Sequence, residues 1–376
     1  MSEDPTPLEK DTRRARVQSL GQAARMRAAR FRKVKVSQGG LAIGVVLLAT
    51  IIGAYLAWRA PPASNLGPAD IRFFQIVTGS TAGTYFPVGE TIAAIISEPP
   101  GAEPCGPRDR CGVRGLLAAV KSSQGSTANV RALMSSSADA AFVQADIADW
   151  AYRGQAMFAG EPVKSLRAIA ALYPEAVQLV TAKTAKIRSV ADLRGRRVSI
   201  DRTGSGTQAD ALLILEAFGL TRTDMAVEEI EVSNAADRLI AGTLDAFFLI
   251  AGTPSNVVTD LADRGLIDIV PIAGPPAEAL AKNSAFFVPY AITADTYAGI
   301  SEVATLSVKA LFVTTTRADA GLIYDITAAL WRPGNRAHID LGHVKGRLIQ
   351  LQTAIDGISI PLHPGAERYY RETGRL

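Results

Sequence analysis

The sequence has little of the chemistry on which metal sites and thiol enzymes depend, with two cysteines and three histidines in 376 residues. Cys105 and Cys111 have no histidine nearby to complete a metal coordination shell, and their spacing is not the C-x-x-C of redox proteins. In an exported protein, this pair is expected to form a disulfide that closes a proline-rich loop. We therefore expect neither a metal nor a cofactor.

Recognisable catalytic motifs are also scarce. The histidines His338, His343 and His363 lie near the C-terminus and do not form an H-E-x-x-H pattern, and the chain has no G-x-S-x-G motif. An enzyme is thus the weaker interpretation, although folding can still bring a base to Ser80 or Ser205.

Positive charge is confined to the start of the chain. Residues 1–40 carry a local balance of +6, which leaves −2 for the remainder of a chain whose net charge is +4. Residues 41–376 lack the net positive charge typical of proteins that bind nucleic acid, so no nucleic-acid partner is expected.

Only one long uncharged apolar run is present, at Leu41–Trp58. As a helix its 18 residues would extend about 27 Å, against a hydrocarbon core of about 30 Å. We interpret it as an uncleaved transmembrane signal anchor, with a cleaved signal peptide as the alternative. The basic tail 1–40 would then be cytoplasmic, 59–70 a linker, and the body periplasmic and anchored to the inner membrane.

After the linker, strand-like and helix-like segments alternate, which predicts an α/β fold with mostly parallel sheets. The pattern includes strands at 71–77, 115–122 and 140–144 and helices at 126–134 and 208–218. Leu166–Tyr173 and Ala176–Ala182 are predicted as two strands separated by Pro174-Glu175.

Two loops rich in glycine and hydroxyl residues follow strands and open helices. The first is Thr78–Tyr85, T-G-S-T-A-G-T-Y, and the second is Asp201–Gln208, D-R-T-G-S-G-T-Q, with Arg202 available as a cation. Glycine lets the backbone approach a ligand, and a helix N-terminus offers unpaired N–H groups to an anion. Two such loops about 120 residues apart predict a cleft between two lobes that holds a small polar ligand.

The body resembles the TAXI group of solute-binding subunits of TRAP transporters. The resemblance is carried by T-G-S-x-x-G-x-Y-F-P at 78–87, C-G-V-x-G-L at 111–116, S-S-Q-G-S-x-A-N-V at 122–130, F-V-Q-A-D at 142–146, A-L-Y-P-E at 171–175 and G-S-G-T at 204–207. Asp201-Arg202-Thr203, Gln208 and Arg114 depart from the pattern expected of the family. The added cation and the missing acid of the second loop favour a more anionic ligand.

The resemblance implies a two-lobed fold of the type II periplasmic-binding-protein kind. Lobe 1 would comprise 71–175 with 290–376 returning to it, and lobe 2 would comprise 176–289. Leu166–Ala182 and Tyr290–Tyr297 would hold the crossing strands. The implied function is to bind a small organic anion, a carboxylate or an amino acid such as glutamate, and to deliver it to a TRAP-type membrane permease.

The resemblance implies a set of ligand contacts. They come from both loops, from the turn that opens the helix at 126–134, and from the ends of strands. They are Ser80, Thr81, Gly83, Thr84, Tyr85, Ser123, Ser126, Asn129, Gln144, Tyr173, Thr203, Ser205, Gly206, Thr207, Gly252 and Pro254. For Tyr173, packing in the core is as good an interpretation as a ligand contact. For Asn129, the alternative is that its side chain forms hydrogen bonds only with the backbone of the turn. We expect Asp146 to cap a helix, because a carboxylate would repel an anionic ligand. A membrane-anchored sensor that acts on a signalling partner remains the alternative function.

Overall fold

The computed structural model describes residues 71–102, 106 and 111–376. The basic tail, the predicted membrane anchor 41–58, the linker 59–70 and Cys105 lie outside these residues, so the anchor and the disulfide stay predictions. No helix within the described ranges has the length and apolar character needed to cross a bilayer. The described residues belong to one compact unit.

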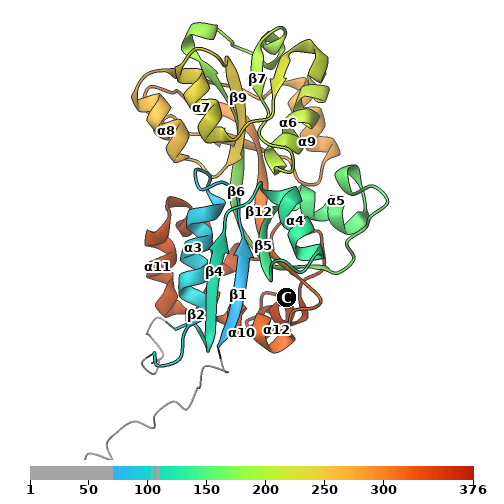
Figure 1. The fold of residues 1–376 in the computed structure, drawn as a ribbon, viewed down its shortest axis with the longest axis vertical. Helices are drawn as coiled ribbons and strands as arrows, with labels where there is room; N and C mark the ends of the chain where they lie inside the picture. The colour runs from blue at the N-terminus through green and yellow to red at the C-terminus, as the bar shows by residue number, and fades with distance from the viewer. Residues whose placement is uncertain (1–70, 103–105, 107–110) are drawn as a thin grey trace, which may run out of the picture. The chain divides into compact units, whose positions relative to one another are not determined.

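Helices and strands alternate through this unit, which confirms the predicted α/β class (Figure 1). The strands are β1 Arg72–Val77, β2 Ser97–Glu98, β3 Val113–Arg114, β4 Leu116–Lys121, β5 Ala140–Gln144, β6 Leu166–Ala182, β7 Arg197–Ser199, β8 Ala226–Glu228, β9 Ala246–Ala251, β10 Ile267–Val270, β11 Val288–Ile292 and β12 Val303–Thr315. The helices are α3 Tyr85–Ile96, α4 Ser126–Met134, α5 Ala145–Arg153, α6 Gly206–Ala217, α7 Val232–Ile240, α8 Asn256–Asp263, α9 Pro275–Asn283, α10 Ala320–Trp331, α11 Arg336–Gly342 and α12 Pro364–Glu372.

The main sheet has the strand order β4-β1-β5-β12-β6-β9-β7-β8, with β10 beside β6 and β11 beside β12. Strands β4, β1 and β5 are parallel to one another, as are β9, β7 and β8. The two long central strands, β6 and β12, are antiparallel to each other and to their outer neighbours. The expectation of mostly parallel pairing therefore holds on both sides of these strands and is wrong at the centre.

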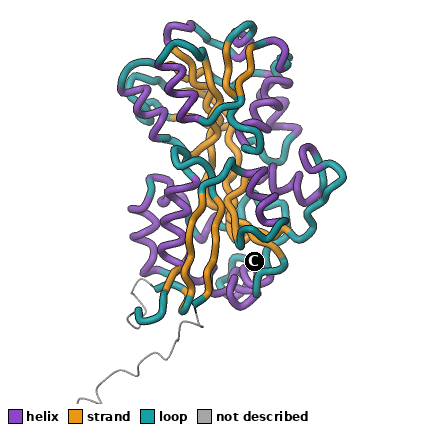
Figure 2. The backbone as a smooth tube through the Cα atoms, in the orientation of Figure 1, coloured by secondary structure: helices purple, strands orange, loops and turns teal. Residues whose placement is uncertain are grey.

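Strands β6 and β12 each contribute to three hydrophobic clusters. Both strands run through the middle of the folded unit (Figures 1 and 2). We call the part built on β1, β4, β5, α3–α5 and α10–α12 the first core region, and the part built on β7, β9, β10 and α6–α9 the second core region. Within β5, Ala140 and Phe142 pack on the α3 side, whereas Ala141 and Val143 pack on the α4 side. Successive side chains of a strand point to opposite faces, so helices on both faces make this strand apolar throughout.

Two strand predictions are wrong. The predicted break at Pro174-Glu175 does not occur, because β6 continues through it for 17 residues. Pro174 lies opposite Lys309, where the pairing register with β12 shifts, and such an irregularity accommodates a residue that has no N–H to donate. The second crossing strand is β12 and not Tyr290–Tyr297, since the shorter β11 ends at Ile292.

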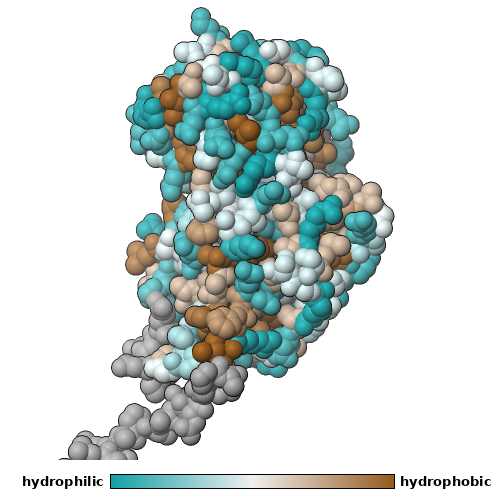
Figure 3. Space-filling model, viewed as in Figure 1, coloured by the Kyte–Doolittle hydropathy of each residue, from teal (hydrophilic) through white to brown (hydrophobic). Residues whose placement is uncertain are grey.

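Exposed apolar side chains on the described surface are few and scattered. Phe73 is 72% exposed and pairs in register with the 38% exposed Leu117, where Figure 3 shows apolar surface over the lower ends of β1 and β4. Isolated pairs of this size are ordinary on protein surfaces.

Candidate functional site

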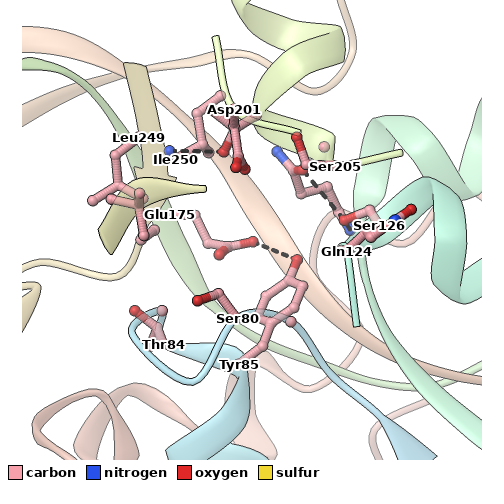
Figure 4. Close-up of a pocket in the computed structure, with 18 of the residues that line it drawn as sticks. Ser80, Thr84, Tyr85, Gln124, Ser126, Glu175, Asp201, Ser205, Leu249 and Ile250 are labelled. Atoms are coloured by element: carbon pink, nitrogen blue, oxygen red, sulfur yellow. Dashed lines mark hydrogen bonds between the residues drawn. The ribbon is translucent and has the colours of Figure 1, made fainter. Parts of the chain in front are cut away.

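A cavity lies where the two core regions face each other (Figure 4). Both glycine and hydroxyl loops line it, together with the start of α4, the end of β5 and the end of β9. The cavity is small, with a volume of about 70 Å³.

Nine of the predicted contact residues line this cavity. They are Ser80, Gly83, Thr84, Tyr85, Ser126, Gln144, Ser205, Gly206 and Thr207. Local folding explains their convergence, because α3, α4 and α6 begin at Tyr85, Ser126 and Gly206 and place their N-terminal N–H groups beside the cavity. Neither α3 nor α4 has a side-chain cap, which suits their first N–H groups to an anion.

The other seven predicted contacts lie outside the lining, which shows that sequence proximity to the loops is not enough. They are Thr81, Ser123, Asn129, Tyr173, Thr203, Gly252 and Pro254. Asn129 donates to the carbonyls of Thr78 and Phe142, so it holds the turn backbone together, as its alternative reading stated. Tyr173 is fully buried in the core of the first region. Thr203 donates to Glu229 at the exposed surface.

Contacts that cross between the two core regions surround the cavity. Gln144 Nε2 donates to Asp210 Oδ2 at 2.7 Å, and the backbone N–H of Ala128 donates to the carbonyl of Gly204 at 3.0 Å. A side chain at Gly206 would meet Gln144 Oε1 at 1.3 Å, so only glycine permits this approach. The regions are thus held against each other by direct contacts.

Arg202 is already engaged by the protein. Its guanidinium lies 3.4 Å from Glu231 and donates to the carbonyl of Ser123 at 2.9 Å. Ser80 also donates to Glu231. Arg202 lines the cavity and its Nε has no partner among the described residues, while its other guanidinium nitrogens face Glu231 and the carbonyl of Ser123.

Carboxyl groups are the part of the site that the sequence prediction missed. Glu175 and Asp201 line the cavity, and the side chains of Asp146 and Asp210 lie buried behind it. Burial raises the pKa of Glu175 to about 8 and that of Asp201 to about 6, and it also raises the pKa values of Asp146 and Asp210. Gln144, and not Asp146, is the N-cap of α5, so the predicted capping role of Asp146 is wrong.

Lys345 is a second residue that the sequence did not indicate. It lies in the short 3-10 helix Val344–Leu348, is 5% exposed, and reaches across to donate to Thr253 Oγ1 at 3.3 Å. Its side chain packs on Gly252, where an added Cβ would meet Lys345 Cγ at 2.7 Å. The absence of a side chain at Gly252 therefore allows Lys345 to pack against the second core region.

These features describe a cavity lined by two glycine and hydroxyl loops in an α/β protein. The chain belongs to the NMT1-like family, whose model matches residues 76–374. Solved structures similar to it include a protein of Bordetella bronchiseptica RB50, with 16% identity, 81% of this chain and 83% of that chain covered, and a TM-score of 0.47.

Two further similar structures are sulfonate-binding proteins. One is the alkanesulfonate-binding protein SsuA of Xanthomonas axonopodis pv. citri, bound to MOPS. It is 14% identical in sequence, the match covers 80% of the present chain and 83% of the SsuA chain, and the TM-score is 0.41. The periplasmic aliphatic sulphonate-binding protein SsuA of Escherichia coli has 14% identity, covers 74% and 79%, and has a TM-score of 0.39. Relationships this distant do not transfer a ligand to the present chain.

Proposed function

We propose that this protein is a periplasmic solute-binding protein that holds a small organic anion between its two core regions and delivers it to a TRAP-type permease. The observation that carries the proposal is the convergence of three helix N-termini and two glycine and hydroxyl loops on one cavity. Thr207 Oγ1 accepts a hydrogen bond from the N–H of Ile250, which leaves its own proton for a ligand oxygen.

In this proposal the two core regions are the lobes that close on the ligand, and residues 41–58 anchor the body at the inner membrane. The Cys105–Cys111 disulfide pins the loop before β3. Delivery depends on the permease recognising the closed form, whose population the ligand increases.

The test is a thermal-shift screen of the full chain in detergent, followed by calorimetry on any compound that stabilises it. The panel contains acetate, succinate, 2-oxoglutarate, L-glutamate and glucose. A carboxylate at a hundredfold excess over its dissociation constant should stabilise the protein by about 2.7 kcal/mol, whereas glucose should not. Stabilisation by none of the carboxylates contradicts the proposal, and turnover of a compound would favour an enzyme.

A further inference from the structure

Glu175 is the one carboxyl group that lies deep in the protein and also lines the cavity. It is 2% exposed, and its side chain points into the space between the core regions (Figure 4). Its Oε2 accepts a hydrogen bond from the hydroxyl of Tyr85 at 2.7 Å. Within the described part of the chain it forms no ion pair, so Oε1 is left for a ligand.

Burial, together with nearby acids, favours a neutral Glu175 carboxyl over the opposing effects of Tyr85 and Lys345. The side chains that act on it are Tyr173 from its own strand, Tyr85 from α3, Asp146 from α5, Asp210 from α6 and Lys345 from the 3-10 helix Val344–Leu348. Two of these are buried acids. The single cation, Lys345, makes its hydrogen bond with Thr253, and burial lowers its pKa.

Hydrogen-bond donors make up most of the polar groups in the rest of the lining, with Asp201 as its second carboxyl. Helix N-termini and hydroxyl groups supply donors, and the one guanidinium at its edge is balanced by Glu231. An ionised Glu175 facing this space would repel an anion, whereas a protonated one supplies a further donor.

We propose that Glu175 recognises the ligand in its protonated form, by donating a hydrogen bond from its carboxyl group to an anionic oxygen of the ligand. This inference rests on the proposed ligand-binding function and deepens it. The ligand and one proton then occupy the site together. No covalent bond of the ligand changes, and at alkaline pH the proton is taken from solvent when the ligand binds.

The first test needs no ligand and compares thermal unfolding of the full-length wild type and Glu175→Gln across pH. The pKa of Glu175 in the folded protein is about 8, against 4.5 for an unperturbed glutamate. Between these pH values the folded wild type holds more protons than the unfolded chain, so its stability falls as pH rises through this window. Glutamine does not titrate. We therefore expect the melting temperature of Glu175→Gln, relative to that of the wild type, to increase as pH rises from about 4.5 to about 8.

The control for this test is Glu302→Gln, which alters an exposed carboxyl outside the cavity lining. Its melting temperature should keep a constant offset from the wild type through the same pH window. A constant offset for Glu175→Gln as well would show that Glu175 is ionised in the folded protein and would overturn the proposal.

The second test measures calorimetric affinity for the carboxylate that stabilises most in the screen of acetate, succinate, 2-oxoglutarate and L-glutamate. With a pKa of about 8, most sites carry the proton at about pH 7 and about a tenth at about pH 9, so wild-type binding should weaken roughly tenfold. Glu175→Gln should flatten this dependence and bind better than Glu175→Ala, which removes the group. Heats measured in buffers of different ionisation enthalpy should show uptake of about one proton at about pH 9 in the wild type alone.

The opposite pH dependence would overturn the proposal, because an ionised Glu175 that accepts from a ligand ammonium group binds better as pH rises. Loss of binding in both Glu175→Gln and Glu175→Ala at every pH would lead to the same conclusion. Binding by none of the four carboxylates would instead contradict the proposed function, while the ligand-free unfolding comparison would still decide the protonation of Glu175.

Discussion

Tyr85 shows how one side chain serves both the core and the cavity. Its ring packs 5.4 Å from that of Phe142, and its hydroxyl donates to Glu175. The motif around Tyr85 predicted a hydroxyl for the ligand, but the structure shows that Glu175 already accepts its proton. Tyr85 therefore acts on the ligand through the carboxyl group it holds.

Tyr85→Phe should move the pH dependence of binding upward. The tyrosine hydrogen bond stabilises the ionised form of Glu175 and so lowers its pKa, against the larger effect of burial. Without that bond the pKa of Glu175 rises, and the alkaline loss of affinity should begin at higher pH than in the wild type. Calorimetry from about pH 6 to about pH 10 checks this, and a midpoint that moves to lower pH would contradict it.

Asp245 offers a test of stability at acid pH, away from the cavity. It accepts two hydrogen bonds from the Arg197 guanidinium, at 2.7 and 3.1 Å, and these bonds hold the pKa of Asp245 below its usual value. A lowered folded-state pKa contributes stability that is present above the unfolded value and is lost as pH falls through the folded value. Asp245→Asn should reduce the free energy of unfolding by about 1 kcal/mol at neutral pH.

The difference between Asp245→Asn and wild type should begin to shrink as pH falls below about 4, where the carboxyl takes up its proton in the unfolded chain, and should disappear below the lowered folded-state pKa. Urea unfolding at neutral pH and at a pH below the folded-state pKa of Asp245 measures this difference in the free energy of unfolding. A difference of equal size at both values would show that the loss comes from packing and not from charge.

At the scale of elements, the start of α6 determines how closely the core regions approach. Gly206 is the first residue of this helix, and Gln144 lies against it. Gly206→Ala should weaken carboxylate binding by roughly tenfold or more, because the added methyl group displaces Gln144 from its contact with Asp210. Gly321→Ala in α10 is the matched control, since that glycine lies outside the cavity lining. Equal binding by the two variants would contradict this role for Gly206.

Elements were predicted well from the sequence where local pattern decides them. The helix expected at 126–134 and the strand expected at 140–144 have the observed bounds. The break assigned to Pro174 failed because a partner strand can absorb a missing N–H by shifting register, and the partner is more than a hundred residues away.

Glu175 was missed for a different reason. Its motif, A-L-Y-P-E, is visible in the sequence, but nothing in the motif marks Glu175 as a buried residue beside a cavity. Only the burial seen in the structure shows that this carboxyl favours a proton.

For the whole folded body, the arrangement of the core regions depends on a few contacts across the cavity. Arg202→Ala removes both the ion pair with Glu231 and the hydrogen bond to the carbonyl of Ser123. The contact between Ala128 N–H and Gly204 should then open more often. Hydrogen exchange should therefore be faster in peptides from the start of α4.

Arg222→Ala is the control for this prediction. Arg222 pairs with Glu229 within the second core region and contacts nothing across the cavity among the described hydrogen bonds and ion pairs. Exchange at the start of α4 should match that of the wild type. Faster exchange in both variants would mean that Arg202 acts only on the stability of its own region.

The pairing of β6 with β12 has one more consequence. Ala176 lies opposite Ser307 in antiparallel register, at the point where both strands pass from one core to the other. Topologically, the first core region is a domain whose chain forms a hairpin here, and the second core region is a single insertion at the tip of that hairpin. A short turn joining Ala176 to Ser307 would therefore remove the second core region, and the cavity with it, without cutting any other connection of the first.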